Sequence, residues 1–234
     1  MASHILFDFF GTLVAYGPEG PDHDFSRTHS MQRSMGSTLG YDEFRALWSS
    51  VGGGLNREAD RTGREFSMLD LSAEFLRQAI AREPTGDEAV AMARAYIADW
   101  DTCVRYLPGL KEMLTGLSPR YKLAVVSNTA DTTLVPAHLN AMKVRDYFDA
   151  VILSVEVGWR KPHPAIFAAA LDALGIGAGD AVFVGDSYLP DYQGPVQAGI
   201  SAFLIDPGRV TKVPDHARLT SIFELPAALA QLAA

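Results

Sequence analysis

Short apolar runs recur along the chain, and each is too short to form a helix of its own. They lie at residues 5–7, 123–126, 151–153, 182–184 and 203–205. Continuous apolar runs of this length are typical of strands that are covered on both faces. Helical patterns separate the last four runs, and this alternation favours a parallel sheet with right-handed crossovers. We therefore predict an α/β fold.

The long segment between the first and second apolar runs has a different pattern. Its apolar positions follow helical spacing, and it shows no convincing strand. Helices are predicted at residues 41–51, 68–80 and 85–100. Three consecutive glycines at residues 52–54 are expected to end the first helix, because glycine is a poor helix former. The polar, Arg-rich residues 56–66 are expected to form a loop or a short turn.

A loop rich in Gly and Pro, residues 14–21, separates the first apolar run from the helical segment. We interpret this loop as a hinge, because Gly and Pro mark chain turns. The pattern therefore predicts two domains. Residues 1–16 and 105–234 would form an α/β core, and residues 17–104 would form a helical domain.

The composition of the 234-residue chain limits the classes of partner. A net charge of -8, without any Lys/Arg cluster, argues against binding to nucleic acid or to anionic membranes. An anionic substrate stays compatible with this charge, because a site can be locally positive. Cys103 is the only cysteine, which excludes an intrachain disulfide and fits a reducing compartment. We recognise no signal peptide and no membrane-spanning run, so we expect a cytoplasmic protein, either a monomer or a homodimer.

Polar and charged residues follow four of the predicted strands. The carboxyl ends of parallel strands meet at one edge of a sheet, so these side chains are expected to converge there. Each residue alone has an ordinary structural interpretation, such as a turn, a helix cap or a solvated cation. Their joint placement after successive strands is what indicates a site. The residues are Asp8, Ser127, Asn128, Lys161, Asp186 and Asp191.

These residues belong to four ordered motifs that resemble those of the haloacid dehalogenase superfamily of aspartate-nucleophile hydrolases. The resemblance covers residues 4–15 and 105–234 and implies a Rossmann-like parallel-sheet core. The helical insert after the first motif resembles the superfamily's cap domain. The motifs read Asp8-Phe9-Phe10-Gly11-Thr12, Ser127, Lys161-Pro162, and Gly185-Asp186-Ser187 followed by Asp191.

The resemblance also implies catalytic roles. Asp8 would be the nucleophile and would form a covalent aspartyl intermediate that water then hydrolyses, while Thr12 would orient the loop around it. Ser127 and backbone amides near Asn128 would hold the transferring anionic group. Lys161 would offset the negative charge of the site and keep Asp8 ionised.

A magnesium site is the second implication of the resemblance. Asp186 and Asp191 would supply hard oxygen ligands for Mg²⁺, completed by Asp8 and the backbone carbonyl of Phe10. A bound cation explains how three carboxylates can share one site. Phe10 and Gly11, which follow the nucleophile closely, are also expected to line the substrate site.

Phe10 is the main departure from the superfamily's pattern. Phosphatases of the superfamily have a second Asp at this position, which acts as general acid and base, and phenylalanine cannot carry a proton. The 2-haloacid dehalogenases of the superfamily have an aromatic Tyr there, and a halide leaves without a proton. Those dehalogenases work without metal and lack the Gly-Asp of the fourth motif, whereas Gly185-Asp186 is intact here.

Three functions remain open on this evidence. The first, which we adopt, is Mg²⁺-dependent hydrolysis of a small phosphorylated metabolite with an altered proton-transfer step. The second is metal-independent dehalogenation of a small 2-halo acid, and the third is a weak or inactive descendant that binds a ligand or partner. In the helical domain, residues 52–64 are a candidate for closing over an anionic substrate.

Overall fold

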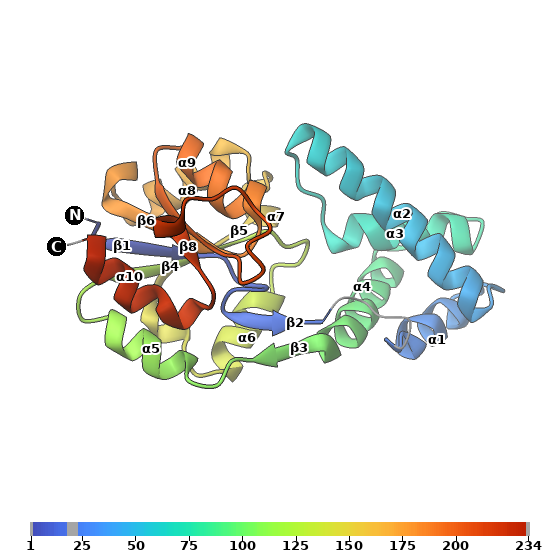
Figure 1. Ribbon diagram of the computed structural model, residues 1–234. Coiled ribbons are helices and arrows are strands. Elements are labelled where there is room, and N and C mark those ends of the chain that lie inside the picture. The colour runs from blue at the N-terminus through green and yellow to red at the C-terminus, as the bar shows by residue number, and fades with distance from the viewer. Residues whose placement is uncertain (1, 18–22, 233–234) are drawn as a thin grey trace. The chain divides into compact units, whose positions relative to one another are not determined.

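The computed structural model describes residues 2–17 and 23–232. The chain divides into two compact units, shown in Figure 1. The first unit comprises Met1–Tyr16 and Arg105–Ala234, and the second comprises Gly17–Val104. Each unit has a buried hydrophobic cluster of its own.

A parallel sheet forms the centre of the first unit. Among the described residues it has six strands in the order β5-β4-β1-β6-β7-β8, with every neighbouring pair parallel. The α/β prediction is therefore confirmed, and the five apolar runs correspond to β1, β4, β5, β6 and β7. The strands of this sheet are β1 (His4–Phe7), β4 (Lys122–Ser127), β5 (Phe148–Leu153), β6 (Ala181–Gly185), β7 (Ser201–Ile205) and β8 (Arg218–Leu219).

Helices cover both faces of this sheet, with α8 and α9 on one side and α5 and α6 on the other (Figure 1). A core cluster that includes Leu6, Val126, Phe167 and Phe183 lies within this unit, and all four side chains are fully buried. Ile5 and Phe7, which alternate with Leu6 along β1 and so point to the opposite face, are fully buried as well. The central strands therefore bury both faces, as their continuous apolar sequences predicted. The helices are α5 (Leu110–Leu117), α6 (Leu134–Ala141), α7 (Ser154–Val157), α8 (Pro164–Leu174), α9 (Gly194–Gln197) and α10 (Leu225–Leu232).

The second unit is helical. An aromatic core that includes Phe25, Phe44, Trp48 and Phe75 holds its helices together. A capping box starts the last helix, because the Thr85 hydroxyl accepts a hydrogen bond from the backbone N–H of Glu88 at 3.2 Å. The helices are α1 (Ser26–Ser34), α2 (Tyr41–Thr62), α3 (Met68–Ala79) and α4 (Gly86–Trp100).

Helix α2 corrects the sequence prediction, because it runs unbroken through the three glycines and through most of the residues expected to form a loop. It begins after Gly40, whose backbone N–H donates to the Glu43 carboxylate at 2.9 Å. It ends at Gly63, which has a left-handed φ of 76°. Phe44 and Trp48 bury its apolar face, and this packing outweighs the cost of about 1 kcal/mol that each glycine adds to a helix.

The segment predicted to be a Gly/Pro-rich loop is also corrected in part. Its residues Val14–Tyr16 form strand β2, which pairs with β3 (Val104–Tyr106) in a two-stranded sheet. A three-residue strand has too little pattern to be recognised from sequence, and its partner lies far along the chain. Residues 18–21 of the segment lie outside the described residues.

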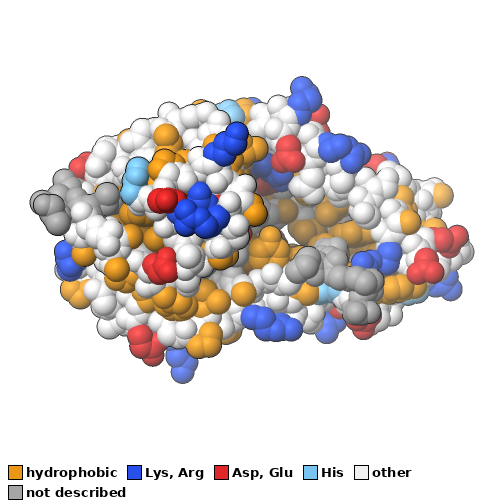
Figure 2. All heavy atoms as spheres, viewed as in Figure 1, with side chains coloured by type: hydrophobic (Ala, Val, Ile, Leu, Met, Phe, Trp, Pro, Cys, Tyr) orange, Lys and Arg blue, Asp and Glu red, His pale blue; other side chains and the backbone are white. Residues whose placement is uncertain are grey.

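The face shown in Figure 2 has no patch of a single charge, because Lys and Arg (blue) are interspersed with Asp and Glu (red). This distribution agrees with the absence of a Lys/Arg cluster from the sequence. Across residues 2–17 and 23–232, no helix combines the length and the apolar character needed to cross a membrane.

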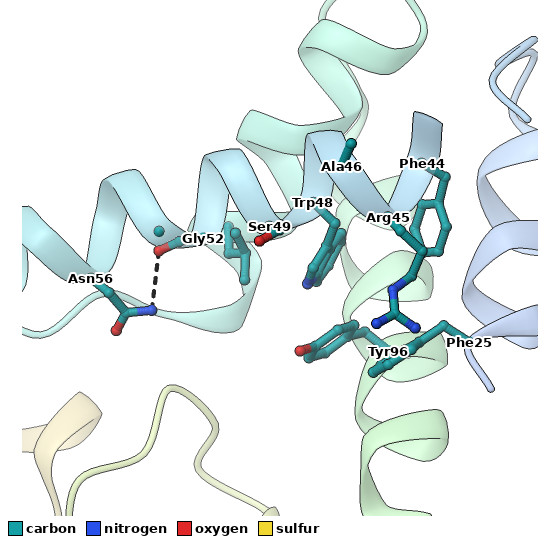
Figure 3. Close-up of a pocket in the computed structure, with 11 residues that line it drawn as sticks. Phe25, Phe44, Arg45, Ala46, Trp48, Ser49, Gly52, Asn56 and Tyr96 are labelled. Atoms are coloured by element: carbon teal, nitrogen blue, oxygen red, sulfur yellow. Dashed lines mark hydrogen bonds between the residues drawn. The ribbon is translucent and has the colours of Figure 1, made fainter. Parts of the chain in front are cut away.

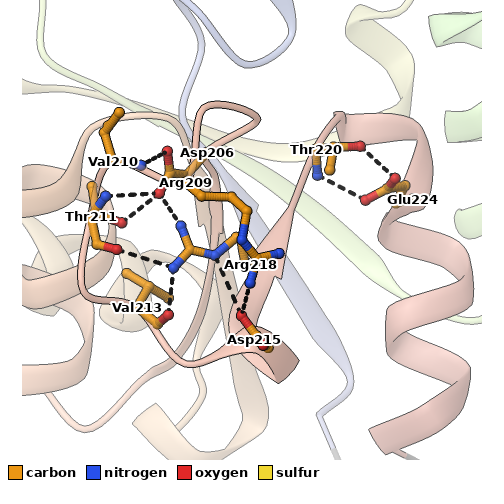
Figure 4. A network of polar contacts seen from close by, with 9 residues as sticks. All are labelled: Asp206, Arg209, Val210, Thr211, Val213, Asp215, Arg218, Thr220 and Glu224. Atoms are coloured by element: carbon orange, nitrogen blue, oxygen red, sulfur yellow. Dashed lines mark hydrogen bonds and ion pairs between the residues drawn. The ribbon is translucent and has the colours of Figure 1, made fainter.

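A buried polar network fastens the chain after β7 (Figure 4). The Asp206 carboxylate accepts hydrogen bonds from the backbone N–H groups of Val210 and Thr211, at 3.0 and 3.1 Å, and from the Thr211 hydroxyl at 2.7 Å. Arg218 donates both to Asp206 and to the carbonyl of Val213. The Thr211 hydroxyl, the backbone N–H groups and Arg218 lower the pKa of Asp206 to about 2.

Substituting Asp206→Asn should lower the urea midpoint of unfolding at pH 7, because a neutral amide cannot accept this set of bonds. The pKa of Asp206 is lower in the folded state than its unfolded-state value of about 3.9. The carboxylate therefore stabilises the protein at pH values above about 3.9, and this contribution disappears as the pH falls towards 2. The two proteins should therefore converge in acid. Asp215→Asn, which removes an exposed carboxylate that pairs with Arg209 and, at 3.9 Å, with Arg218, is the control and should have little effect.

The substitution Gly54→Ala should raise the free energy of unfolding by about 1 kcal/mol, because alanine is the better helix former. A Cβ at this position meets only the Arg57 Nη2 atom, at 4.0 Å. Gly63→Ala in the same helix should instead destabilise by about 1 kcal/mol, since its φ of 76° is left-handed. Urea unfolding of both variants measures the difference, and equal effects at the two positions would contradict it.

Candidate active site

Asp8 lies directly after the central strand β1. Its backbone N–H donates to the carbonyl of Val184 at 2.8 Å, which extends the strand pairing to the position of the carboxylate. One carboxylate oxygen accepts from the Thr12 hydroxyl at 3.1 Å, and the other accepts from the Lys161 ammonium at 2.7 Å. Asp8 is 7% exposed. The carboxylate is therefore fixed in orientation and still reachable.

Lys161 joins the first and fourth motifs. Its ammonium donates to Asp8 and to Asp191, at 2.7 Å each, and the residue is only 2% exposed. Burial alone would lower the pKa of Lys161, but the charges of Asp191 and Asp8 outweigh it and raise the pKa. The Asn128 side chain forms two hydrogen bonds with the Lys161 backbone. It accepts from the backbone N–H at 2.7 Å and donates to the backbone carbonyl at 2.9 Å. Asn128, which we expected beside the substrate, thus uses its side chain to position Lys161, and a contact of its backbone amide with the substrate stays a prediction.

Two glycines allow the carboxylates of the fourth motif to lie directly against the neighbouring backbone. A Cβ at Gly11 would lie 2.3 Å from a carboxylate oxygen of Asp186, and Gly11 also has a φ of +88°. A Cβ at Gly185 would lie 2.4 Å from Asp191, which sits in a π-helical turn. Side chains at these positions would clash with the acidic residues, so glycine is required by close approach.

The carboxylates of Asp8, Asp186 and Asp191 form a group in which each residue offers an oxygen within 4.8 Å of the others. Burial, followed by the charge of Asp8, raises the pKa of Asp186 to about 6. Burial and the same charge also raise the pKa of Asp191, against the opposing effect of Lys161. These shifts record an excess of buried negative charge. A divalent cation with a preference for oxygen ligands fits this donor set, because it would relieve that excess.

Ser127 supplies a buried hydroxyl at the same edge of the sheet. The register pairs Phe7 with Val125, so Ser127, the last residue of β4, lies just beyond the level of Asp8. The residue is 1% exposed, and its hydroxyl has no hydrogen-bond partner among the described residues. A buried hydroxyl left in this state is costly, and an anionic ligand would satisfy it.

The ring of Phe10 belongs to a cluster that the sequence did not reveal. Its centroid lies 4.9 Å from that of Phe9, 6.0 Å from that of Tyr16 and 6.4 Å from that of His138. His138 comes from α6, and its Nδ1 lies 3.0 Å from the hydroxyl of Tyr106. No sequence motif marks Tyr16 or His138, since each reaches Phe10 through the tertiary fold alone.

The second unit contains a pocket of its own, about 480 Å³ in volume (Figure 3). The rings of Trp48 and Tyr96 stack at 4.3 Å along it, and the Arg45 guanidinium lies 4.8 Å from the ring centre of Phe25. Arg45 also donates to the carbonyl of His23 at 2.9 Å. Two of the three glycines of α2 line the pocket. Closure of this region over a substrate stays a prediction.

Comparison with protein families supports the motif assignment. The model of the haloacid dehalogenase-like hydrolases matches residues 66–205. This range contains Ser127, Lys161, Asp186 and Asp191, whereas Asp8 precedes it. The family match therefore covers three of the four motifs and more than half of the chain.

Two curated relatives are named as phosphatases. The ribulose-1,5-bisphosphate 5-phosphatase of Halopiger xanaduensis is 27% identical over 220 residues, which cover 93% of this chain and 90% of that protein. The N-acylneuraminate-9-phosphatase of Mus musculus is 37% identical over 125 residues. That second match covers 51% of this chain and 50% of the relative, so it spans only about half of either protein.

Solved structures show the same fold. A 2-haloacid dehalogenase from Pseudomonas syringae pv. Tomato DC3000 superposes with a TM-score of 0.71 over 99% of this chain and 100% of that chain. Its sequence identity of 22% makes this a likeness of fold alone. The family match and the motif geometry show that this chain is a member of the haloacid dehalogenase-like hydrolase family.

Proposed function

We propose that this hydrolase is a Mg²⁺-dependent phosphatase of small phosphorylated metabolites, with Asp8 as its covalent nucleophile. The three converging carboxylates of Asp8, Asp186 and Asp191 around Lys161 carry this proposal. The phosphatase names of the two relatives support the same activity.

The charge balance of the site favours this reading. Three carboxylates and one ammonium leave an excess of negative charge when all are ionised, and a phosphate ester would be repelled by it. Asp8, Asp186 and Asp191, with the backbone carbonyl of Phe10, would hold Mg²⁺. When bound there, the ion supplies the positive charge that offsets the phosphate oxygens.

The chain's own residues then perform two displacements. An oxygen of Asp8 bonds to phosphorus, the bond from phosphorus to the leaving oxygen breaks, and water later hydrolyses the aspartyl phosphate. Lys161 and Thr12 hold the carboxylate in place through their hydrogen bonds to its two oxygens. The Ser127 hydroxyl, which is buried without a hydrogen-bond partner among the described residues, would hold the transferring phosphoryl group.

Dehalogenation is the second candidate, and Phe10 is the observation that favours it. A ring packed against Phe9 and Tyr16 transfers no proton, and a departing halide needs none. The buried carboxylates of Asp186 and Asp191 oppose this candidate, since without a metal they would repel the carboxylate of a 2-halo acid. The phosphatase assignment therefore has the stronger support.

The proposal predicts Mg²⁺-dependent phosphate release that is abolished by Asp8→Asn, because an amide cannot act as the nucleophile. The assay uses an aryl phosphate, an alkyl phosphate and a 2-chloro acid, each with Mg²⁺ or with EDTA. More than a few per cent of activity in Asp8→Asn would exclude the covalent mechanism. Halide release in EDTA would establish the dehalogenase instead. Mg²⁺ binding without turnover of any substrate would indicate a binding protein.

A metal site predicts opposite effects of Asp186→Asn on stability with and without Mg²⁺. The pKa of Asp186 is raised from 3.8 to about 6 in the folded state. Ionisation of Asp186 therefore lowers the stability of the metal-free protein as the pH rises through this range, and the loss is complete above a pH of about 6. At pH 8 in EDTA the variant should therefore be more stable than the wild type, by about 3 kcal/mol at most. Mg²⁺ should raise the thermal midpoint of the wild type but not that of the variant.

The control for this experiment is Asp172→Asn on the exposed surface of α8, which should respond to Mg²⁺ as the wild type does. A variant at position 186 that kept the full Mg²⁺ response would remove Asp186 from the metal site. Destabilisation of Asp186→Asn in EDTA at pH 8 would contradict the excess of negative charge.

A further inference from the structure

Lys161 lies at the centre of a short turn, residues 159–163, that connects α7 to α8. Its ammonium reaches Asp8 and Asp191 at the same time, at 2.7 Å each. A small shift of the turn would lengthen both contacts, and a misplacement of about 1 Å at a catalytic site can cost about 10²-fold in rate. The contacts that fix this turn therefore decide how well the site is aligned.

Backbone groups hold the middle of the turn. The Asn128 side chain, at the end of β4, clamps the backbone N–H and carbonyl of Lys161. Within the turn, the backbone N–H of His163 donates to the carbonyl of Arg160 at 2.9 Å. These hydrogen bonds fix the lysine and the residues next to it, and the two ends of the turn are joined by side chains instead.

The rings of Trp159 and His163 join those ends. They lie face to face, with centroids 3.9 Å apart and planes at 11°. The imidazole is also fixed at its edge, because its Nδ1 accepts from the backbone N–H of Ala165 at 3.2 Å and thereby caps α8. Ile166 and Phe167 anchor the first turn of this helix in the core, where both are fully buried. The indole is thus fastened, through the imidazole, to the buried start of α8.

We propose that the stacked rings of Trp159 and His163 are a positioning device that closes the turn around Lys161 and holds its ammonium on the two carboxylates. The inference rests on the proposed phosphatase activity, in which Lys161 orients the nucleophile Asp8. Both rings act through Lys161. Loss of the stack should therefore lower kcat, because the nucleophile is less well oriented, and leave KM nearly unchanged, because no contact with the substrate is removed.

His163 allows the ring to be separated from the helix cap. His163→Asn removes the ring but keeps a side-chain oxygen, and asparagine is a favourable N-cap residue. His163→Phe keeps a ring that can stack on Trp159 but removes the acceptor for the Ala165 N–H. A role in capping α8 alone predicts that the Phe variant is the more impaired. Positioning by the stack predicts the opposite order for kcat.

The test measures kcat and KM for the Mg²⁺-dependent hydrolysis of 4-nitrophenyl phosphate. Trp159→Leu and His163→Asn should each lower kcat at least about tenfold, with KM within about threefold of the wild type. Trp159→Phe, which keeps a ring, should recover most of the lost kcat. His163→Phe should keep most of kcat while it lowers the thermal midpoint. Phe223→Leu, which removes an exposed ring outside the four motifs, is the control and should change neither constant.

The outcomes separate this inference from the proposed function. An unchanged kcat in Trp159→Leu overturns the positioning role, and so does a higher KM with kcat preserved, since the ring would then contact the substrate. Equal losses of kcat in His163→Phe and His163→Asn also overturn it, because the cap would then be responsible. Phosphate release by the wild type leaves the proposed function standing in all these cases.

A wild type that releases no phosphate overturns the proposed function and this inference together. Thermal midpoints show which variants are folded at the assay temperature. If Trp159→Leu does not fold, the two His163 variants decide the question.

Discussion

The buried ammonium of Lys161 is the interaction on which the rest of the site depends. Taking a lysine and two carboxylates out of water is costly, and their contacts at 2.7 Å must compensate for that cost. Loss of the ammonium would leave Asp8 and Asp191 facing each other in a buried space. The clamp formed by the Asn128 side chain fixes the lysine backbone and thereby positions the ammonium.

Excess negative charge links the architecture to the chemistry. Gly11 and Gly185 allow carboxylates to approach to distances that any larger residue would prevent. Without a cation, these neighbouring carboxylates repel one another. The ionised carboxylate of Asp186 therefore lowers the stability of the metal-free protein, although the same group would help to hold Mg²⁺. The same excess of negative charge would repel an anionic substrate in a site without a metal. It therefore favours a metal-dependent phosphatase over a metal-independent dehalogenase, even though Phe10 matches the aromatic position of the dehalogenase motif.

Proton transfer distinguishes this chain from the pattern of its superfamily. Exchanging an acidic side chain for Phe10 removes a proton from the loop, but it also creates an aromatic surface on which Tyr16 rests. The small sheet of β2 and β3 then places a phenol beside the loop of the nucleophile.

The sequence by itself determined the parallel sheet and the motif residues at its carboxyl edge, because an apolar run such as residues 123–126 reports burial locally. It misjudged helix α2, since the penalty of the glycines is local whereas the packing of Phe44 and Trp48 that overrides it is not. Only the tertiary structure decided that Asn128 would clamp Lys161 and that Tyr16 would lie against Phe10. Those contacts join residues 33 and 6 positions apart through strand ends and turns, whose geometry no periodicity records.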